Sequence, residues 1–157
     1  MSAFVVRKRI LGIDFGRARI GVAVSDELGM LAHPVETIPT SRGNPATRIC
    51  EIAAEKNVER VVVGLPRHMS GALGDAAAEA LAFVEKLRTA LPCEVVTWDE
   101  RLTTVAANRA LRDNGQKTRN SRGIVDQVAA QMILQGYLDA LQDQRDSEAR
   151  NDFRSGQ

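Results

Sequence analysis

The sequence predicts an α/β protein with a mixed five-stranded sheet and helices on both faces. Three short apolar runs joined by tight turns come first, which indicates an antiparallel three-strand meander. Helical and strand-like segments then alternate, which indicates right-handed crossovers that add two parallel strands. With 157 residues, 44% of them apolar and 26% charged, the chain is long enough for one globular domain with a substantial core.

The meander is predicted from apolar runs over residues 10–14, 20–25 and 30–38, the last interrupted by Pro34. Gly12, Gly16 and Gly21 allow either a positive φ or a close approach of another backbone. The stretch 11–26 therefore reads as a β-hairpin that ends its first strand on an acid, Asp14. A charge at a position where alternation would bury the side chain needs a compensating partner.

The later elements follow from helix signals and apolar periodicity. Asn44 and Pro45 form a helix start, an N-cap followed by proline at the first helical position. The expected order is a helix over 44–57, a strand over 60–66, a helix over 75–90, a strand over 94–98, a helix from 103 or 104 to 114, and a last helix over 124–141.

Residues 1–141 are expected to form one domain, and residues 142–157 a disordered tail, because the tail is polar and carries almost nothing apolar beyond Phe153. Cys50 and Cys93 lie far apart without a partner motif and are interpreted as reduced thiols. No run is long enough to span a membrane and no signal peptide is evident, so a cytoplasmic location is expected. The net charge of +1 neither favours nor excludes nucleic acid.

Acidic residues stand at positions that structure alone does not favour. Asp14 ends the first strand, Asp99 and Glu100 end the fifth, and Asp126 lies in the most apolar part of the last helix. Ligands in an open α/β sheet gather at the carboxyl ends of strands. Clustered carboxylates repel each other unless a cation lies among them, and Mg²⁺ or Mn²⁺ suits their hard oxygen atoms. Such ions promote phosphodiester hydrolysis, which predicts a metal-dependent nuclease of the two-metal type.

Simpler alternatives remain open for each acid alone. Asp99 or Glu100 could pair with Arg101 or begin the next helix, Asp126 could be a first-turn acid favoured by the helix dipole, and Asp14 could stabilise a turn. The acids taken together are more informative than any one of them.

Basic residues surround the same predicted edge of the sheet and could hold phosphates. A role for His68 as ligand or base is the less favoured interpretation. The candidates for nucleic-acid binding are Arg17, Arg19, Arg67, Lys117, Arg119 and Arg122.

Four blocks in the sequence closely resemble the bacterial YqgF (RuvX) family. They are Leu-Gly-Ile-Asp-Phe-Gly from residue 11 with Arg-Ile-Gly-Val-Ala-Val-Ser-Asp from 19, Val-Gly-Leu-Pro from 63, Asp-Glu-Arg-Leu-Thr-Thr from 99, and Val-Asp-Gln-Val-Ala-Ala from 125. The last block continues with Ile-Leu-Gln from 133, and the resemblance extends across residues 11–137 in the family's order. Ser70 stands where an acid is frequent in the family, and Arg122 where lysine is common.

The resemblance implies an RNase H-like fold and a metal-dependent nuclease related to Holliday-junction resolvases, with maturation of the 5′ end of pre-16S rRNA as its usual assignment. It places the family's acidic positions on Asp14, Glu100 and Asp126, with Asp99 as a possible fourth. The expected substrate is structured RNA, with branched DNA as the alternative. A non-catalytic RNA-binding factor remains open, as does the choice between monomer and homodimer. The first block also resembles the phosphate-binding hairpin of actin-like ATPases, but those clamp nucleotide between two such domains and this chain supplies one.

Overall fold

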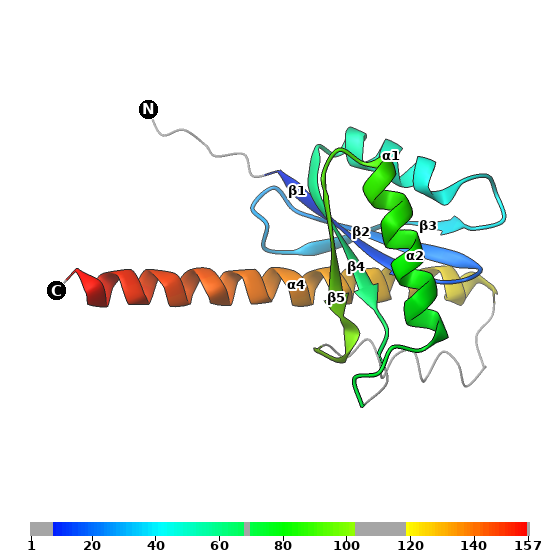
Figure 1. Cartoon of the computed structure of the whole chain (residues 1–157). Helices are drawn as coiled ribbons and strands as arrows, with labels where there is room; N and C mark the ends of the chain where they lie inside the picture. The colour runs from blue at the N-terminus through cyan, green and yellow to red at the C-terminus, as the bar shows by residue number, and fades with distance from the viewer. Residues whose placement is uncertain (1–7, 68–69, 103–118, 157) are drawn as a thin grey trace.

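The computed structural model describes residues 8–67, 70–102 and 119–156, and the side chains of residues 119–125 are outside the description. The meander consists of β1 (Arg9–Phe15), β2 (Arg19–Ser25) and β3 (Ala32–Pro39), with β2 antiparallel to both of the others. On the other side of β1, β4 (Val58–Leu65) and β5 (Glu94–Asp99) add in parallel. The resulting order β3-β2-β1-β4-β5 confirms the predicted mixed sheet (Figure 1).

Helices cover both faces of this sheet. On one face, α1 (Pro45–Glu55) and α2 (Asp75–Ala90) bury a core that takes alternate residues of β1, β2 and β4. On the other face, α4 (Arg119–Ser155) buries a second core against the intervening residues (Figure 1). The helix predicted over 103–114 lies outside the described residues. In the described part of the chain, no helix is long and apolar enough to cross a membrane.

The start of α1 forms as the sequence predicts. The side chain of Asn44 accepts a hydrogen bond from the backbone N–H of Ala46 at 3.1 Å, and Pro45 occupies the first turn. Ile49 and Ile52 face the core and are almost completely buried. At the sheet edge, the β2–β3 register shifts where Ala23 opposes Pro34, because proline donates no hydrogen bond to the ladder.

Three glycines let α4 lie very close to the sheet. A Cβ atom on Gly12 would come 2.6 Å from Cβ of Leu134, and a Cβ atom on Gly64 would overlap Ile133. A Cβ atom on Gly21 would overlap the backbone carbonyl group of Asp126. None of the three has a positive φ, so the close approach of α4 is what requires glycine here.

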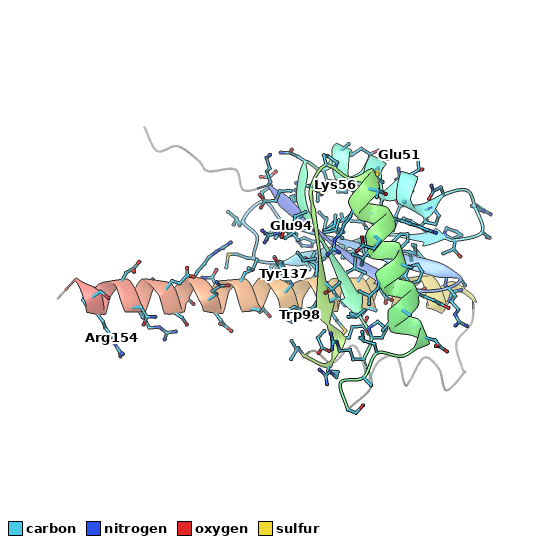
Figure 2. All side chains as sticks on the ribbon, viewed as in Figure 1. Glu51, Lys56, Glu94, Trp98, Tyr137 and Arg154 are labelled. Atoms are coloured by element: carbon cyan, nitrogen blue, oxygen red, sulfur yellow. The ribbon has the colours of Figure 1, made fainter. Side chains whose placement is uncertain are left out.

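Away from these glycines, aromatic side chains fill the space between α4 and β5. The rings of Trp98 in β5 and Tyr137 in α4 meet edge to face with their centroids 6.0 Å apart (Figure 2). Nη1 of Arg60 donates a hydrogen bond of 2.7 Å to the Tyr137 hydroxyl. This hydrogen bond joins β4 to α4 next to the contact between Trp98 and Tyr137.

The last helix is longer than predicted at both ends. It begins at Arg119 rather than near residue 124, and it continues to Ser155, where the sequence predicts disorder beyond Leu141. Leu141 is the last described residue that packs against the second core, and residues 143–155 are exposed along a helix that extends away from the sheet (Figure 1). Hydrogen bonds of 3.0 Å from Gln142 to Asp146 and 3.3 Å from Gln144 to Glu148 support this extension.

Candidate active site

Three carboxylates that the sequence singles out are buried on the α4 side of the sheet. Asp14 near the end of β1 is 2% exposed, Glu100 directly after β5 is 2% exposed, and Asp126 in α4 is 4% exposed. Burying a carboxylate is costly unless cations or hydrogen-bond donors compensate its charge. Asp126 is the eighth residue of α4 and therefore lies beyond the first turn, which removes helix-dipole capping as its explanation.

Asp14 and Asp126 are brought together through Gly21. In the β1–β2 ladder, Asp14 lies directly opposite Gly21. The backbone of Asp126 lies against Gly21, so closely that no side chain fits between them. A residue of α4 is thereby placed next to the end of β1, although 112 positions separate the two acids in the chain.

Glu100 reaches the same face from the other side of β1. Ile13 is aligned with Val63 in the parallel β1–β4 pair, so Asp14 and Gly64 follow in neighbouring positions. Oε1 of Glu100 lies 2.7 Å from the point that a Cβ atom on Gly64 would occupy. Glycine at position 64 therefore leaves the space that the carboxylate of Glu100 uses.

Arg19 compensates the buried charge of Asp126. Its Nε atom lies 2.8 Å from Oδ2 of Asp126, and the Arg19 side chain is 33% exposed. The sequence predicts Arg19 as a phosphate-binding residue, and the structure shows it holding one of the three acids. Because one third of the Arg19 side chain is exposed, this ion pair lies between the buried acid and the protein surface.

The donor chemistry of the site fits a divalent metal ion. Carboxylate oxygens are the ligands that Mg²⁺ and Mn²⁺ prefer, and the three acids provide them on one face. In the part of the chain that the structure describes, however, no group of three or more histidine, cysteine, aspartate or glutamate side chains is arranged to hold one ion. Mg²⁺ commonly takes one or two carboxylates and completes its shell with water and substrate phosphate. The residues therefore fit an ion of that kind better than a closed all-protein cage.

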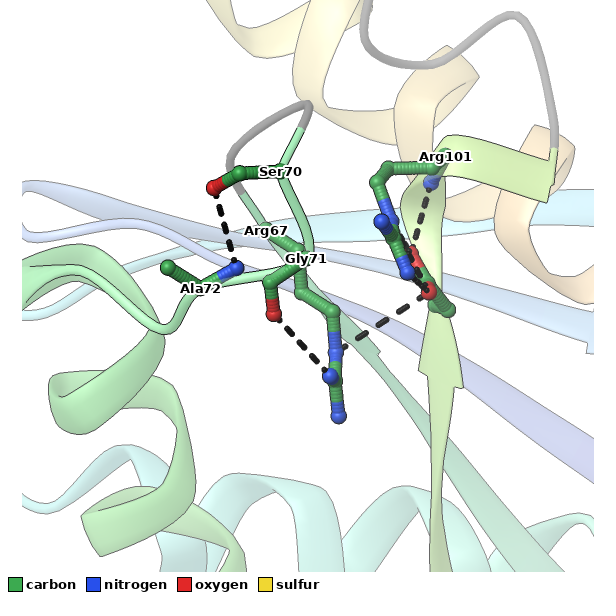
Figure 3. A network of polar contacts seen from close by, with 6 residues as sticks. Arg67, Ser70, Gly71, Ala72 and Arg101 are labelled. Atoms are coloured by element: carbon green, nitrogen blue, oxygen red, sulfur yellow. Dashed lines mark hydrogen bonds and ion pairs between the residues drawn. The ribbon is translucent and has the colours of Figure 1, made fainter.

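Asp99, the possible fourth acid, makes ion pairs with arginine. Its carboxylate accepts hydrogen bonds from Nε of Arg101 at 3.0 and 3.1 Å and from Nη2 at 2.6 Å (Figure 3). Nε of Arg67 lies 3.9 Å from the same Oδ2 atom. The hydrogen bonds from Arg101 hold the pKa of Asp99 below its ordinary value, with a smaller contribution from Arg67. Of the two neighbouring acids, Glu100 is the one that is buried on the α4 side.

Arg17 lies on the other side of the sheet from the three acids. Its guanidinium makes a two-pronged ion pair with Glu79 of α2, at 2.8 to 3.0 Å, and both side chains are exposed. The hydrogen bond from Arg17 lowers the pKa of the Glu79 carboxyl. A pocket of about 480 Å³ adjoins this pair, lined among others by Phe15 and Phe83. The pocket and the three acids thus occupy different faces of the molecule.

The remaining predicted basic residues are described only in part. Arg67 follows β4 and donates from Nη1 to the carbonyl oxygen of Gly71 at 3.3 Å. His68, Lys117 and the side chains of Arg119 and Arg122 lie outside the described residues, so their placement stays a prediction. Ser70, at the position where the family often has an acid, accepts a 3.4 Å hydrogen bond from the backbone N–H of Ala72 (Figure 3).

Two features of the site are absent from the sequence-based prediction. The first is the role of Arg101. The sequence suggests it only as an ion-pair partner of Asp99 or Glu100, and its position near Arg67 depends on how the strands pair. Leu65 is aligned with Asp99, so the residues that follow β4 and β5 become neighbours. Gly64 is the second feature, because its closeness to Glu100 depends on the β4–β5 pairing and its closeness to Ile133 depends on the docking of α4.

Similarity to solved structures agrees with this architecture. RuvC of Thermus thermophilus, solved in complex with a Holliday junction substrate, superposes with a TM-score of 0.50 at 19% identity, covering 87% of this chain and 96% of that one. The same protein in a second structure gives a TM-score of 0.50 at 18% identity, covering 86% and 96%. At this level of identity the likeness concerns the fold, and it confirms the RNase H-like architecture.

Sequence relatives are much closer. A protein of Nocardia farcinica is 50% identical over 141 residues, which cover 85% of this chain and 78% of the relative. A protein of Acetivibrio thermocellus is 46% identical over 136 residues, which cover 84% and 96%. Both carry the name "Putative pre-16S rRNA nuclease". The family model described as "RuvX: Holliday junction resolvase" matches residues 8–140, and this chain therefore belongs to the RuvX family.

Proposed function

We propose that this protein is a metal-dependent nuclease that processes the 5′ end of pre-16S rRNA in the cytoplasm. Asp14, Glu100 and Asp126 are its catalytic residues. The observation that carries the proposal is the burial of these three carboxylates on one face of the sheet, where β1 and β5 end and α4 crosses them. A fold without a function for these groups would gain stability by replacing them with apolar side chains. The names of the close relatives support RNA as the substrate.

The residues divide the work by position. Asp14, Glu100 and Asp126 would hold Mg²⁺ or Mn²⁺, which when bound supplies a water of lowered pKa and polarises the phosphate. Arg19 keeps the Asp126 carboxylate oriented and is exposed enough to meet a phosphate oxygen. Gly64 preserves the space beside Glu100, and the buried surroundings of the acids limit the access of bulk water.

A cleavage assay with Asp14→Asn tests the proposal. We expect the wild type to cut a pre-16S rRNA fragment with Mg²⁺ or Mn²⁺ and not with EDTA, and we expect the variant to lose at least about 100-fold in rate while it remains folded. Asp139→Asn is the matched control, because Asp139 is an exposed aspartate of α4 that accepts a hydrogen bond from Gln135. Full activity of Asp14→Asn, or no cleavage by the wild type, would contradict the proposal.

Cleavage of four-way DNA junctions is the alternative within the same chemistry, and the description of the family model favours testing it. The two substrates are compared in one assay with the same preparation. If the wild type cuts the junction in preference to RNA and Asp14→Asn cuts neither, the protein is a nuclease whose substrate is branched DNA. If the wild type binds pre-rRNA without cutting either substrate, the protein is a non-catalytic binding factor.

A further inference from the structure

Two arginines from different strand ends converge on Asp99. Arg67 follows β4, and Arg101 lies in the short 3₁₀ turn after β5 (Glu100–Leu102). Arg101 binds the Asp99 carboxylate through hydrogen bonds, and Nε of Arg67 lies 3.9 Å from the same carboxylate (Figure 3). Two positive charges share one negative charge, so the cluster of these three side chains keeps a surplus of positive charge. We call Arg67 and Arg101 the arginine pair.

The geometry fixes Arg101 more firmly than an ordinary surface ion pair would. Its side chain binds Asp99 through the Nε–Nη2 edge, and its backbone N–H also donates to Oδ1 of Asp99 at 3.0 Å. Nη1 lies outside that edge, 3.2 Å from the point that a Cβ atom on Gly71 would occupy. Gly71 has a φ of 86°, which glycine adopts without strain. The loop after β4 therefore passes close to Arg101 without displacing it.

The arginine pair remains reachable from solvent. The side chains of Arg67 and Arg101 are 34% and 36% exposed, and that of Asp99 is 22% exposed. Asp99 and Glu100 are consecutive, so their Cα atoms are about 3.8 Å apart. The carboxylate that holds Arg101 thus belongs to the residue that directly precedes Glu100, one of the proposed catalytic acids.

We propose that the arginine pair binds a phosphodiester group of the substrate strand next to the cleaved bond, and that Asp99 is a positioning residue for Arg101 and not a metal ligand. This inference rests on the proposed nuclease function. Asp99 engages the Nε–Nη2 edge of Arg101, so Nη1 and the positive charge of the guanidinium are left for a phosphate oxygen. A guanidinium already oriented by a carboxylate loses less freedom on binding.

The test is RNA binding in EDTA, where metal-dependent cleavage does not occur, measured by fluorescence anisotropy over a series of KCl concentrations. When a side chain that neutralises one phosphate of a single strand is removed, the slope of log Kd against log salt falls by about 0.7. We expect this change and a weaker affinity for Arg101→Gln and for Arg67→Gln. Arg101→Lys should restore the slope and only part of the affinity, because lysine keeps the charge but lacks the planar guanidinium that Asp99 orients.

Arg48→Gln is the matched control. Arg48 has a side chain that is 37% exposed and pairs with Glu36 and Glu51, so it resembles Arg101 in exposure and pairing but belongs to α1. Its replacement should leave the salt slope unchanged. Thermal unfolding of each variant verifies that the fold is kept. Slopes of Arg101→Gln and Arg67→Gln that equal the wild-type slope overturn the phosphate site, and so does undetectable binding by the wild type.

Asp99→Asn separates a positioning residue from a metal ligand. If Asp99 only orients Arg101, the variant keeps the wild-type Mn²⁺ concentration for half-maximal cleavage and binds RNA more weakly. A several-fold rise in that Mn²⁺ concentration with unchanged RNA affinity overturns the assignment. The two proposals fail separately. Wild type that binds RNA with the expected arginine dependence but never cuts it disproves the nuclease alone, and cleavage with unaltered slopes disproves the phosphate site alone.

Discussion

Nε of Arg19, at the start of β2, lies 2.8 Å from Oδ2 of Asp126 in α4, although 107 positions separate the two residues in the chain. The carboxylate side chain is 5% exposed and the arginine 33%. One ion pair therefore joins the meander to the last helix and also compensates a buried acid of the candidate active site. This contact is therefore expected to affect both the stability of the fold and the proposed active site.

Arg19→Gln should lower the free energy of unfolding by about 1–3 kcal/mol. Removing one partner of a fully buried pair costs more, but Arg19 is one third exposed and solvent screens part of the effect. Urea unfolding measures the change. Arg9→Gln is the control, because Arg9 at the start of β1 pairs with Glu27 in a more exposed bridge of 3.3 Å. If both variants lose the same free energy of unfolding, the ion pair with Asp126 contributes no more to stability than an exposed ion pair.

Gly21→Ala should destabilise the protein by about 2–3 kcal/mol, because the added methyl group meets the backbone of Asp126, which cannot rotate away as a side chain could. We expect lower cleavage activity as well, since α4 must move and carries Asp126 with it. Thermal unfolding and the cleavage assay measure both effects. Gly156→Ala, where the nearest atoms lie at 3.6 and 3.8 Å, should change neither. A Gly21→Ala protein with wild-type stability would refute the close contact.

Cys93 should react slowly with thiol reagents at neutral pH. Burial raises the pKa of its thiol, the neighbouring Cys50 adds to the effect, and only the thiolate reacts. Labelling of Cys50→Ser with a chromogenic disulfide isolates Cys93. Because a raised pKa lowers the thiolate fraction at any given pH, the rate should rise with a midpoint above the ordinary value of about 8.5. A midpoint at or below that value would contradict the burial.

A chain that ends at Leu141 should keep its melting temperature within about 3 °C and retain cleavage activity, because residues 142–156, which the structure describes, pack in neither core. Its helical circular dichroism should fall. The extension in the full chain ends near Arg154, far along α4 from Tyr137 (Figure 2). Loss of the cooperative transition in the shorter chain would show that the extension stabilises the domain.

The sheet and its three acids could be predicted because local patterns carry them. A strand that is covered on both faces has a run of β-branched residues, as at residues 61–63. The N-cap residue Asn44 marks the start of α1. The strand ends then place Asp14 and Glu100 at one edge without knowledge of any long-range contact. Their roles as ligands stay a prediction.

Other features depend on contacts that no local pattern encodes. The sequence leaves open whether Gly12 and Gly21 serve a turn or a close approach, and only the docking of α4 decides for close approach. The convergence of Arg67 and Arg101 on Asp99 requires the β4–β5 register. Composition predicts disorder for the tail, but a helix already nucleated by its docked part extends at little further cost.

The close seating of α4 also has a consequence for the order of events as the protein forms. Residues that cover the second face of the sheet and the residue that completes the acid set belong to the same helix, late in the chain. A nascent protein that has made Asp14 and Glu100 still lacks Asp126. Docking of α4 on the open face of the sheet therefore also brings the third proposed catalytic acid into place, so a chain in which α4 has not docked lacks the complete proposed site.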